Sequence, residues 1–168
     1  GLVTGRECAG STIREAHCPQ GAVIEHDSFA GFAPFGHVCV RCGQAPEQVQ
    51  IVPMDEPSFT GTKNGAHIQT SSDGRFIYAS NRGANSMQVY AVDEQTGKLT
   101  EVQRVSATGK TPWDFSLDPT GRWLLVANNA SNSTNVFSVD PASGKLTPGE
   151  AWLPINQPSN VTFLQAAN

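Results

Sequence analysis

The 168-residue sequence contains one pattern twice, at a constant offset of 47 positions. The stretch from Ala66 to Gly83 corresponds without a gap to the stretch from Trp113 to Ala130. The two copies stay in step as far as Thr100 and its counterpart Thr147. A period between 20 and 50 residues indicates stacked repeats, and a period in the forties with several strands per unit is typical of a β-propeller blade.

The repeat therefore predicts an all-β fold with two four-stranded antiparallel blades and the first strand of another, an incomplete propeller. Alternating apolar residues and glycine turns place the strands. We expect the blades within residues 49–168, the first over 66–112 and the second over 113–159. The expected strands are 66–70, 76–80, 87–92 and 99–105 in the first blade, 113–117, 123–127, 134–139 and 146–153 in the second, and 160–164 after them.

Residues 1–48 lie outside the repeat and hold all four cysteines, Cys8, Cys18, Cys39 and Cys42. Alternation is poor in this segment, so we expect irregular structure. The cysteines are compatible with a small zinc site built on the Cys39 to Cys42 knuckle, with a disulfide, or with free thiols. Residues 35–46 also admit codons that, shifted by one base, encode a blade's third strand and turn, so a frameshifted repeat unit is a further hypothesis.

The composition narrows the functional classes. A net charge of -4 gives no electrostatic footprint for nucleic acid, and no apolar run is long enough for a membrane helix. The first residue is Gly, and no secretory segment follows it. We expect a cytoplasmic protein with neither nucleic-acid nor membrane partners, and we treat its first residue as uncertain as a natural start.

Positions that differ between the two copies while their neighbours match are candidates for function. Arg82 corresponds to Asn129, His67 to Asp114, and Ala66 to Trp113. First strands line the channel of a propeller, which places His67 and Trp113 there, and Arg82 follows a second strand at the channel mouth. The alternatives are a solvated loop arginine, a core histidine and an inter-blade tryptophan.

The motifs from Ser72 to Ser86, Gly109 to Phe115 and Asp118 to Asn128 resemble the C-terminal blades of the seven-bladed lactonase family. This family includes propeller-type 6-phosphogluconolactonases and carboxy-muconate lactonising enzymes. The resemblance covers residues 49–165. It departs at Trp113, where the family usually has Arg after Pro, and at His67, where an acidic residue is common.

The resemblance implies hydrolysis of a small sugar lactone in the channel, without metal or cofactor. Of the family's proposed His, Arg, Glu and Arg site, only the last Arg is present here, as Arg82. We assign Arg82 and His67 to catalysis, because a guanidinium binds two oxygens at once and His67 is the nearby candidate base. Asn81, Trp113 and Asn128 are assigned to substrate binding, although Asn81 and Asn128 match between the copies and are also expected to act as turn and cap residues.

Two blades are fewer than the four of the smallest common propeller, which leaves a second hypothesis open. The chain is then a non-catalytic propeller fragment or a blade-pair module that assembles with other chains. Exposed blade edges favour self-association in either case. A zinc-binding module carried on blades is a third hypothesis.

Overall fold

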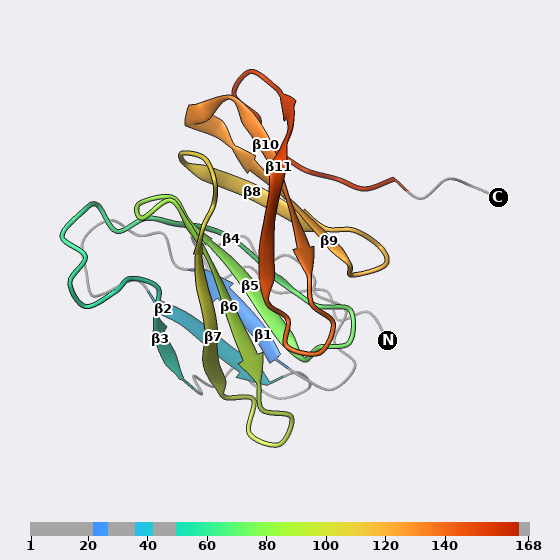
Figure 1. Ribbon diagram of the computed structural model, residues 1–168. Coiled ribbons are helices and arrows are strands. Elements are labelled where there is room, and N and C mark those ends of the chain that lie inside the picture. Colours follow the sequence, from blue (N-terminus) through green and yellow to red (C-terminus); the bar gives the residue numbers. More distant parts are fainter. Residues whose placement is uncertain (1–21, 27–35, 42–49, 165–168) are drawn as a thin grey trace, which may run out of the picture.

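The computed structural model describes residues 22–26, 36–41 and 50–164, and its strands form three antiparallel sheets (Figure 1). We name the three sheets the N-sheet, blade 1 and blade 2. The N-sheet is β1 (Ala22–His26), β2 (Gly36–Arg41) and β3 (Ile51–Pro53); blade 1 is β4 (Gly65–Thr70), β5 (Phe76–Asn81), β6 (Ser86–Val92) and β7 (Leu99–Ser106); blade 2 is β8 (Pro112–Leu117), β9 (Trp123–Asn128), β10 (Ser133–Val139) and β11 (Leu146–Pro154).

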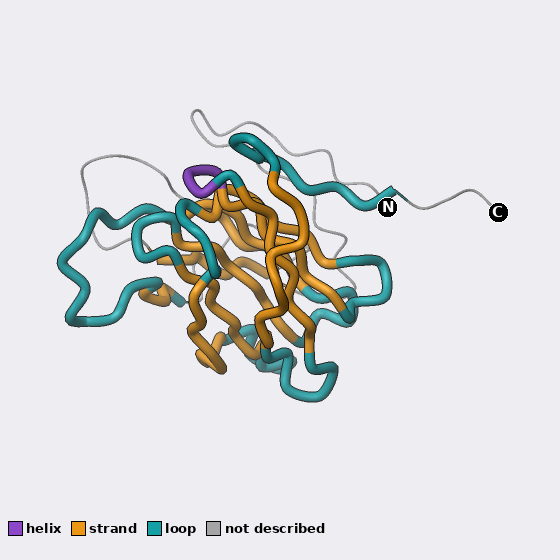
Figure 2. The backbone as a smooth tube through the Cα atoms, turned by 45° about the horizontal axis from the view of Figure 1, so that its top comes forward, coloured by secondary structure: helices purple, strands orange, loops and turns teal. Residues whose placement is uncertain are grey.

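Each blade pairs its strands in chain order, so the two predicted four-stranded blades are confirmed to within a residue or two at each strand end. Glycines close the hairpins at equivalent places. Gly74 and Gly121 have φ of 74° and 68°, and Gly97 and Gly144 have φ of 72° and 70°. Glycine adopts this left-handed conformation without the clash that a Cβ causes. The single 3-10 turn in the described part is η1 (Asn129–Ser131), drawn purple in Figure 2.

Alternation along the strands gives blade 1 two apolar faces. Ile77 and Ala79 point toward the N-sheet, where Val52 and Met54 cover them. The intervening residues point the other way and pack against blade 2. This second core contains ten buried residues: Phe76, Tyr78, Met87, Val89, Ala107, Phe115, Leu124, Val126, Phe137 and Leu146.

Polar side chains join consecutive sheets at their outer strands. The Gln103 side chain accepts a hydrogen bond from Leu146 N and donates one to Leu146 O, at 2.7 and 2.9 Å. Gln50 makes the same pair of bonds with Leu99, at 2.8 and 3.2 Å. The Tyr78 hydroxyl donates to Gly144 O at 3.1 Å, and burial together with the nearby Asp73 charge raises the pKa of Tyr78 to about 12.

Two expectations differ from the structure. Residues 160–164 are not in a strand, because no second strand lies beside them to pair with among the described residues. Conversely, β1 and β2 form inside residues 1–48, where we expected irregular structure, and they pair with β3. Their side chains, including Cys39, and the other three cysteines lie outside what the structure describes. No helix in the described residues is long and apolar enough to cross a membrane.

Candidate functional site

The candidate site lies where β4 and β8, the first strands of the two blades, run next to each other. Gly65 at the start of β4 pairs with Asn81 at the end of β5, and Pro112 at the start of β8 pairs with Asn128 at the end of β9. The beginnings of the inner strands and the ends of the second strands therefore meet at one end of both blades. His67, Arg82 and Trp113 all belong to this end.

Arg82 is fixed on two sides by its own blade and by the next one. Its Nη2 donates to Asn64 Oδ1 at 2.8 Å and to the Gly65 carbonyl at 3.0 Å. Its guanidinium carbon lies 4.7 Å from the centre of the Trp113 ring, a cation–π contact. Partial burial lowers the pKa of Arg82, but a guanidinium remains charged at neutral pH. The site thus contains a fixed positive charge.

His67 lies beside the carboxylate of Asp114 on the neighbouring inner strand. Its Nδ1 is 3.4 Å from Asp114 Oδ1, which is an ion pair when the ring is protonated. The ring makes a T-shaped contact with Phe115, with centroids 4.9 Å apart and planes at 71°. The imidazole side chain is 27% exposed, so solvent reaches it. A histidine oriented by a carboxylate and open to water is suited to proton transfer.

Asp114 is the residue that the sequence analysis did not assign to the site. Its side chain is 11% exposed, and its Oδ2 accepts hydrogen bonds from Asn160 Nδ2 at 3.0 Å and from Val161 N at 2.9 Å. The signal was present in the repeat, because His67 and Asp114 are equivalent positions of consecutive blades. Equivalent residues of adjacent inner strands lie close together, so the mismatched pair is also a contact.

Asn81 and Asn128, predicted to bind substrate, are instead 1% and 0% exposed. Asn81 Nδ2 donates to Asp55 Oδ1 at 2.7 Å, and its Oδ1 accepts from Ala84 N at 3.0 Å. Asn128 Nδ2 donates to Ala107 O and to Asn135 Oδ1, both at 3.0 Å. These amides hold the connections at the strand ends, and a role in substrate binding stays a prediction.

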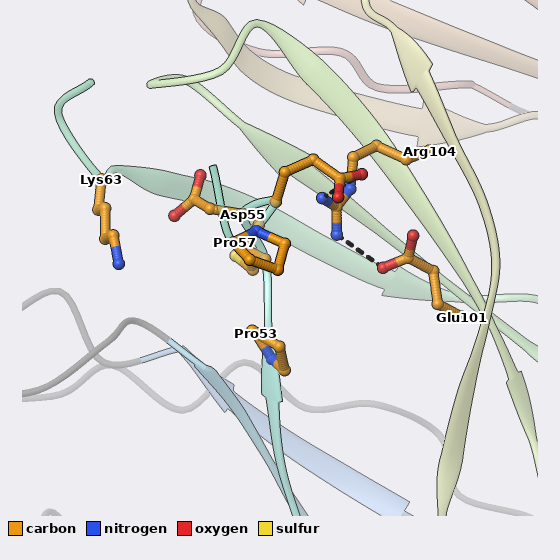
Figure 3. A pocket seen from close by; sticks show the side chains of 8 residues that line it. Pro53, Asp55, Pro57, Lys63, Glu101 and Arg104 are labelled. Atoms are coloured by element: carbon orange, nitrogen blue, oxygen red, sulfur yellow. Dashed lines mark hydrogen bonds and ion pairs between the residues drawn. The ribbon is translucent and has the colours of Figure 1, made fainter. Parts of the chain in front are cut away.

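A cavity of about 300 Å³ at the junction of the N-sheet and blade 1 is a separate feature (Figure 3). Arg104 on its wall pairs with Glu56 at 2.9 Å and with Glu101 at 2.6 Å. Two carboxylates already neutralise this arginine, and Asp55 and Lys63 add one charge of each sign, so acidic side chains outnumber basic ones in the lining. The cavity is thus poorly suited to an anionic sugar. In the described residues, His, Cys, Asp and Glu form no group of three that could hold a metal ion.

Comparison with known proteins places this geometry in a family. The profile described as "Lactonase, 7-bladed beta-propeller" matches residues 41–163. The chain belongs to the seven-bladed β-propeller lactonase family. This confirms the resemblance seen in the sequence. Since seven blades define the family and the structure describes two complete ones, the chain contains a part of the family's propeller.

The relatives of this lactonase-family chain are longer than it is. It is 41% identical over 73 residues to the 6-phosphogluconolactonase of Bacillus subtilis, which covers 44% of this chain and 21% of the relative. The structure of the periplasmic gluconolactonase of Pseudomonas aeruginosa matches with a TM-score of 0.72 and 31% identity, over 77% of this chain and 36% of that one. A putative 6-phosphogluconolactonase from Bacteroides uniformis matches with a TM-score of 0.69 and 28% identity, over 77% and 37%.

Proposed function

We propose that this chain supplies one sector of a lactone-hydrolysing channel, with a small sugar lactone as substrate. The observation that carries the proposal is the Arg82 guanidinium, held by Asn64, Gly65 and Trp113 at the same end of the blades as the partly exposed His67. The names of the relatives add the substrate class, since those proteins are described as 6-phosphogluconolactonases or gluconolactonases.

The residues divide the chemistry between them. Lactone hydrolysis adds water to the ring carbonyl and breaks the ring C–O bond, which gives a hydroxy acid. His67 accepts the proton of the attacking water and returns it to the leaving alkoxide, while Asp114 orients the ring. Arg82 stabilises the oxyanion or binds the substrate's anionic group. Trp113 forms the wall that holds the guanidinium in place.

The test is hydrolysis of 6-phosphogluconolactone by purified protein, measured as acid release above the spontaneous rate. Arg82→Ala should lower kcat/KM by at least about tenfold, because one contact that stabilises the developing charge contributes on the order of a few kcal/mol. Lys98→Ala is the control, since it removes a cation from an exposed turn. Equal rates for both variants would remove Arg82 from the site.

A second candidate function is a non-catalytic assembly module. It is favoured by the share of the relatives that the chain spans, which is 21% of the Bacillus protein and 36% of the Pseudomonas structure. The two candidates separate in one measurement. A folded protein of known mass that gives no hydrolysis above background is a module, and hydrolysis that depends on Arg82 marks an enzyme.

A further inference from the structure

Blade 2 exposes an apolar face whose equivalent in blade 1 is buried. We call it the C-face and define it by Trp123, Leu125 and Val136. The residues 47 positions earlier are Phe76, Tyr78 and Val89, which are 8%, 1% and 0% exposed because blade 2 covers them. Trp123, by contrast, is 50% exposed. The C-face thus has the chemistry of a surface that receives a further sheet.

The C-face is also hollowed. Its three residues, with Asp118, Pro119 and Phe163, line a depression of about 460 Å³. Large exposed apolar surface that is concave commonly marks a protein–protein contact. The repeat states what kind of sheet fits, since in blade 1 the same position receives the Phe115, Leu124 and Phe137 side of a four-stranded antiparallel sheet.

The end of the chain is placed as the inner strand of that next sheet. Asn85 and Asn132 are both left-handed, with φ of 53° and 52°. Asn85 Oδ1 accepts from Thr111 N at 2.7 Å, just before β8, and Asn132 Oδ1 accepts from Gln157 N at 2.9 Å. Residues 158–164 therefore leave blade 2 as β8 leaves blade 1, but no second strand in the described part pairs with them.

The N-sheet lacks an inner strand beside β1 among the described residues, which is the kind of strand that residues 158–164 could supply. Gln50, just before β3, bonds to Leu99 on β7, the outer strand of blade 1, whereas β1 lies near the inner strand β4. The N-sheet thus consists of outer, third and second strands, and within the described residues nothing pairs with the free edge of β1. On β3, Val52 packs toward blade 1, while Ile51 points the opposite way and is 55% exposed.

We propose that two copies of this chain assemble head to tail, with residues 158–164 of each copy completing the N-sheet of the other. One inner strand and three remaining strands make one four-stranded blade, and the C-face packs on the Ile51 side of that blade. Each copy then contributes two complete blades and two parts of shared blades. The assembly is a ring of six blades, which is one fewer than the seven of the family and lies within the four to eight that propellers use, and it leaves no free inner edge.

The complementarity of the parts favours a second copy over other occupants. Addition of a strand to an open sheet edge is a common mode of recognition, because the backbone hydrogen bonds supply affinity. Both halves of the contact are present on one chain, so identical copies supply them twice in a closed ring. This inference does not depend on lactone hydrolysis.

The test is the mass of the full chain by light scattering across a concentration series, at about 1–100 μM. The expected result is a dimer of twice 17.9 kDa. Trp123→Glu and Ile51→Glu should each give monomers, because each places a charge in one half of the same contact. Both side chains are at least half exposed, so the monomer should still fold, as checked by circular dichroism and thermal unfolding. Glu94→Lys, in an exposed turn, is the control and should remain dimeric.

A third variant tests the strand itself. Val161 N donates to Asp114. In the strand that the dimer requires, successive N–H groups alternate in direction, so the N–H of Thr162 faces β1 of the other copy. Thr162→Pro removes that donor and should weaken dimerisation at least tenfold. A wild-type monomer at every concentration overturns the proposal. So does a dimer that Trp123→Glu breaks and Ile51→Glu leaves intact, which would be a symmetric C-face pair, and so does a closed ring of more than two chains.

Discussion

At the scale of single residues, the turn aspartates show how local hydrogen bonds govern stability. Asp73 is partly desolvated, which alone would raise its pKa, but hydrogen bonds from Ser71 and Arg75 outweigh this effect and lower the pKa to about 2 from 3.8. A carboxyl with a lower pKa in the folded state stabilises the fold above its unfolded pKa. That contribution is lost as the pH falls through the folded value.

We therefore predict that Asp73→Asn makes the free energy of unfolding less dependent on pH in the acid range. The wild-type free energy of unfolding should fall more steeply than that of the variant between about pH 4 and pH 2. Urea denaturation at a series of fixed pH values measures the free energy of unfolding of both proteins. Glu94→Gln removes a charge from another exposed turn and serves as the reference. Parallel pH curves for wild type and Asp73→Asn would contradict the prediction.

Alanine substitutions at the equivalent glycines Gly97 and Gly144 distinguish the cost of backbone strain from the cost of a steric clash. Gly97 and Gly144 have φ of 72° and 70°, so alanine at either position costs about 1–2 kcal/mol. A Cβ on Gly97 meets nothing within 4 Å, whereas one on Gly144 lies 2.5 Å from the Phe76 ring. Gly144→Ala should destabilise by about 1–3 kcal/mol more than Gly97→Ala, because it overpacks the contact between the blades. Chemical denaturation of both variants decides it, and equal losses would rule out the steric part.

The candidate site was only partly predictable at this scale. The mismatch with the repeat mate selected Arg82, His67 and Trp113, and the structure brings Arg82 and Trp113 into contact. Asp114 was missed because a contact between equivalent positions appears only when adjacent inner strands are placed side by side. Asn81 and Asn128 were assigned to substrate binding, but their amides donate to Asp55 and Ala107, contacts that fit the turn and cap role also expected for this matching pair.

At the scale of elements, the paired hydrogen bonds from Gln103 and Gln50 to the neighbouring outer strands should stabilise the packing between sheets. Gln103→Ala leaves Leu146 N and O without their side-chain partner, and we predict a loss of about 1–2 kcal/mol in the free energy of unfolding. Thr147→Ala, at an exposed position of β11 next to Leu146, is the control. If Gln103→Ala lowers the free energy of unfolding no more than the control does, water replaces the two hydrogen bonds to Leu146.

Strand positions followed from the repeat because alternation and glycine turns are local signals. Whether a stretch becomes a strand also depends on a partner, which no local pattern contains. Residues 160–164 carry the alternation but lack a neighbouring strand. β1 and β2 carry little alternation, yet they pair with each other and with β3. The two discrepancies thus have one cause, which is that pairing is a tertiary property.

At the scale of the whole molecule, membership of the family and the number of described blades support different conclusions about function. The sequence profile and the structural matches place the chain among propeller lactonases. Under the proposed function, the described residues form one sector of a channel, and hydrolysis requires whatever completes the rest. Loss of the proposed dimer and loss of hydrolysis can be tested separately, because Trp123 lies on the outer face of blade 2 and Arg82 at the channel end.

The two faces of each blade differ, and this difference gives the chain a direction. The C-face accepts the kind of face that blade 2 already presents to blade 1, so one copy can add to the next as monomers add to a growing polymer. Growth stops only when the angle between copies brings the last free edge back to the first. A small change in that angle would turn a closed pair into an open filament, with no new contact required.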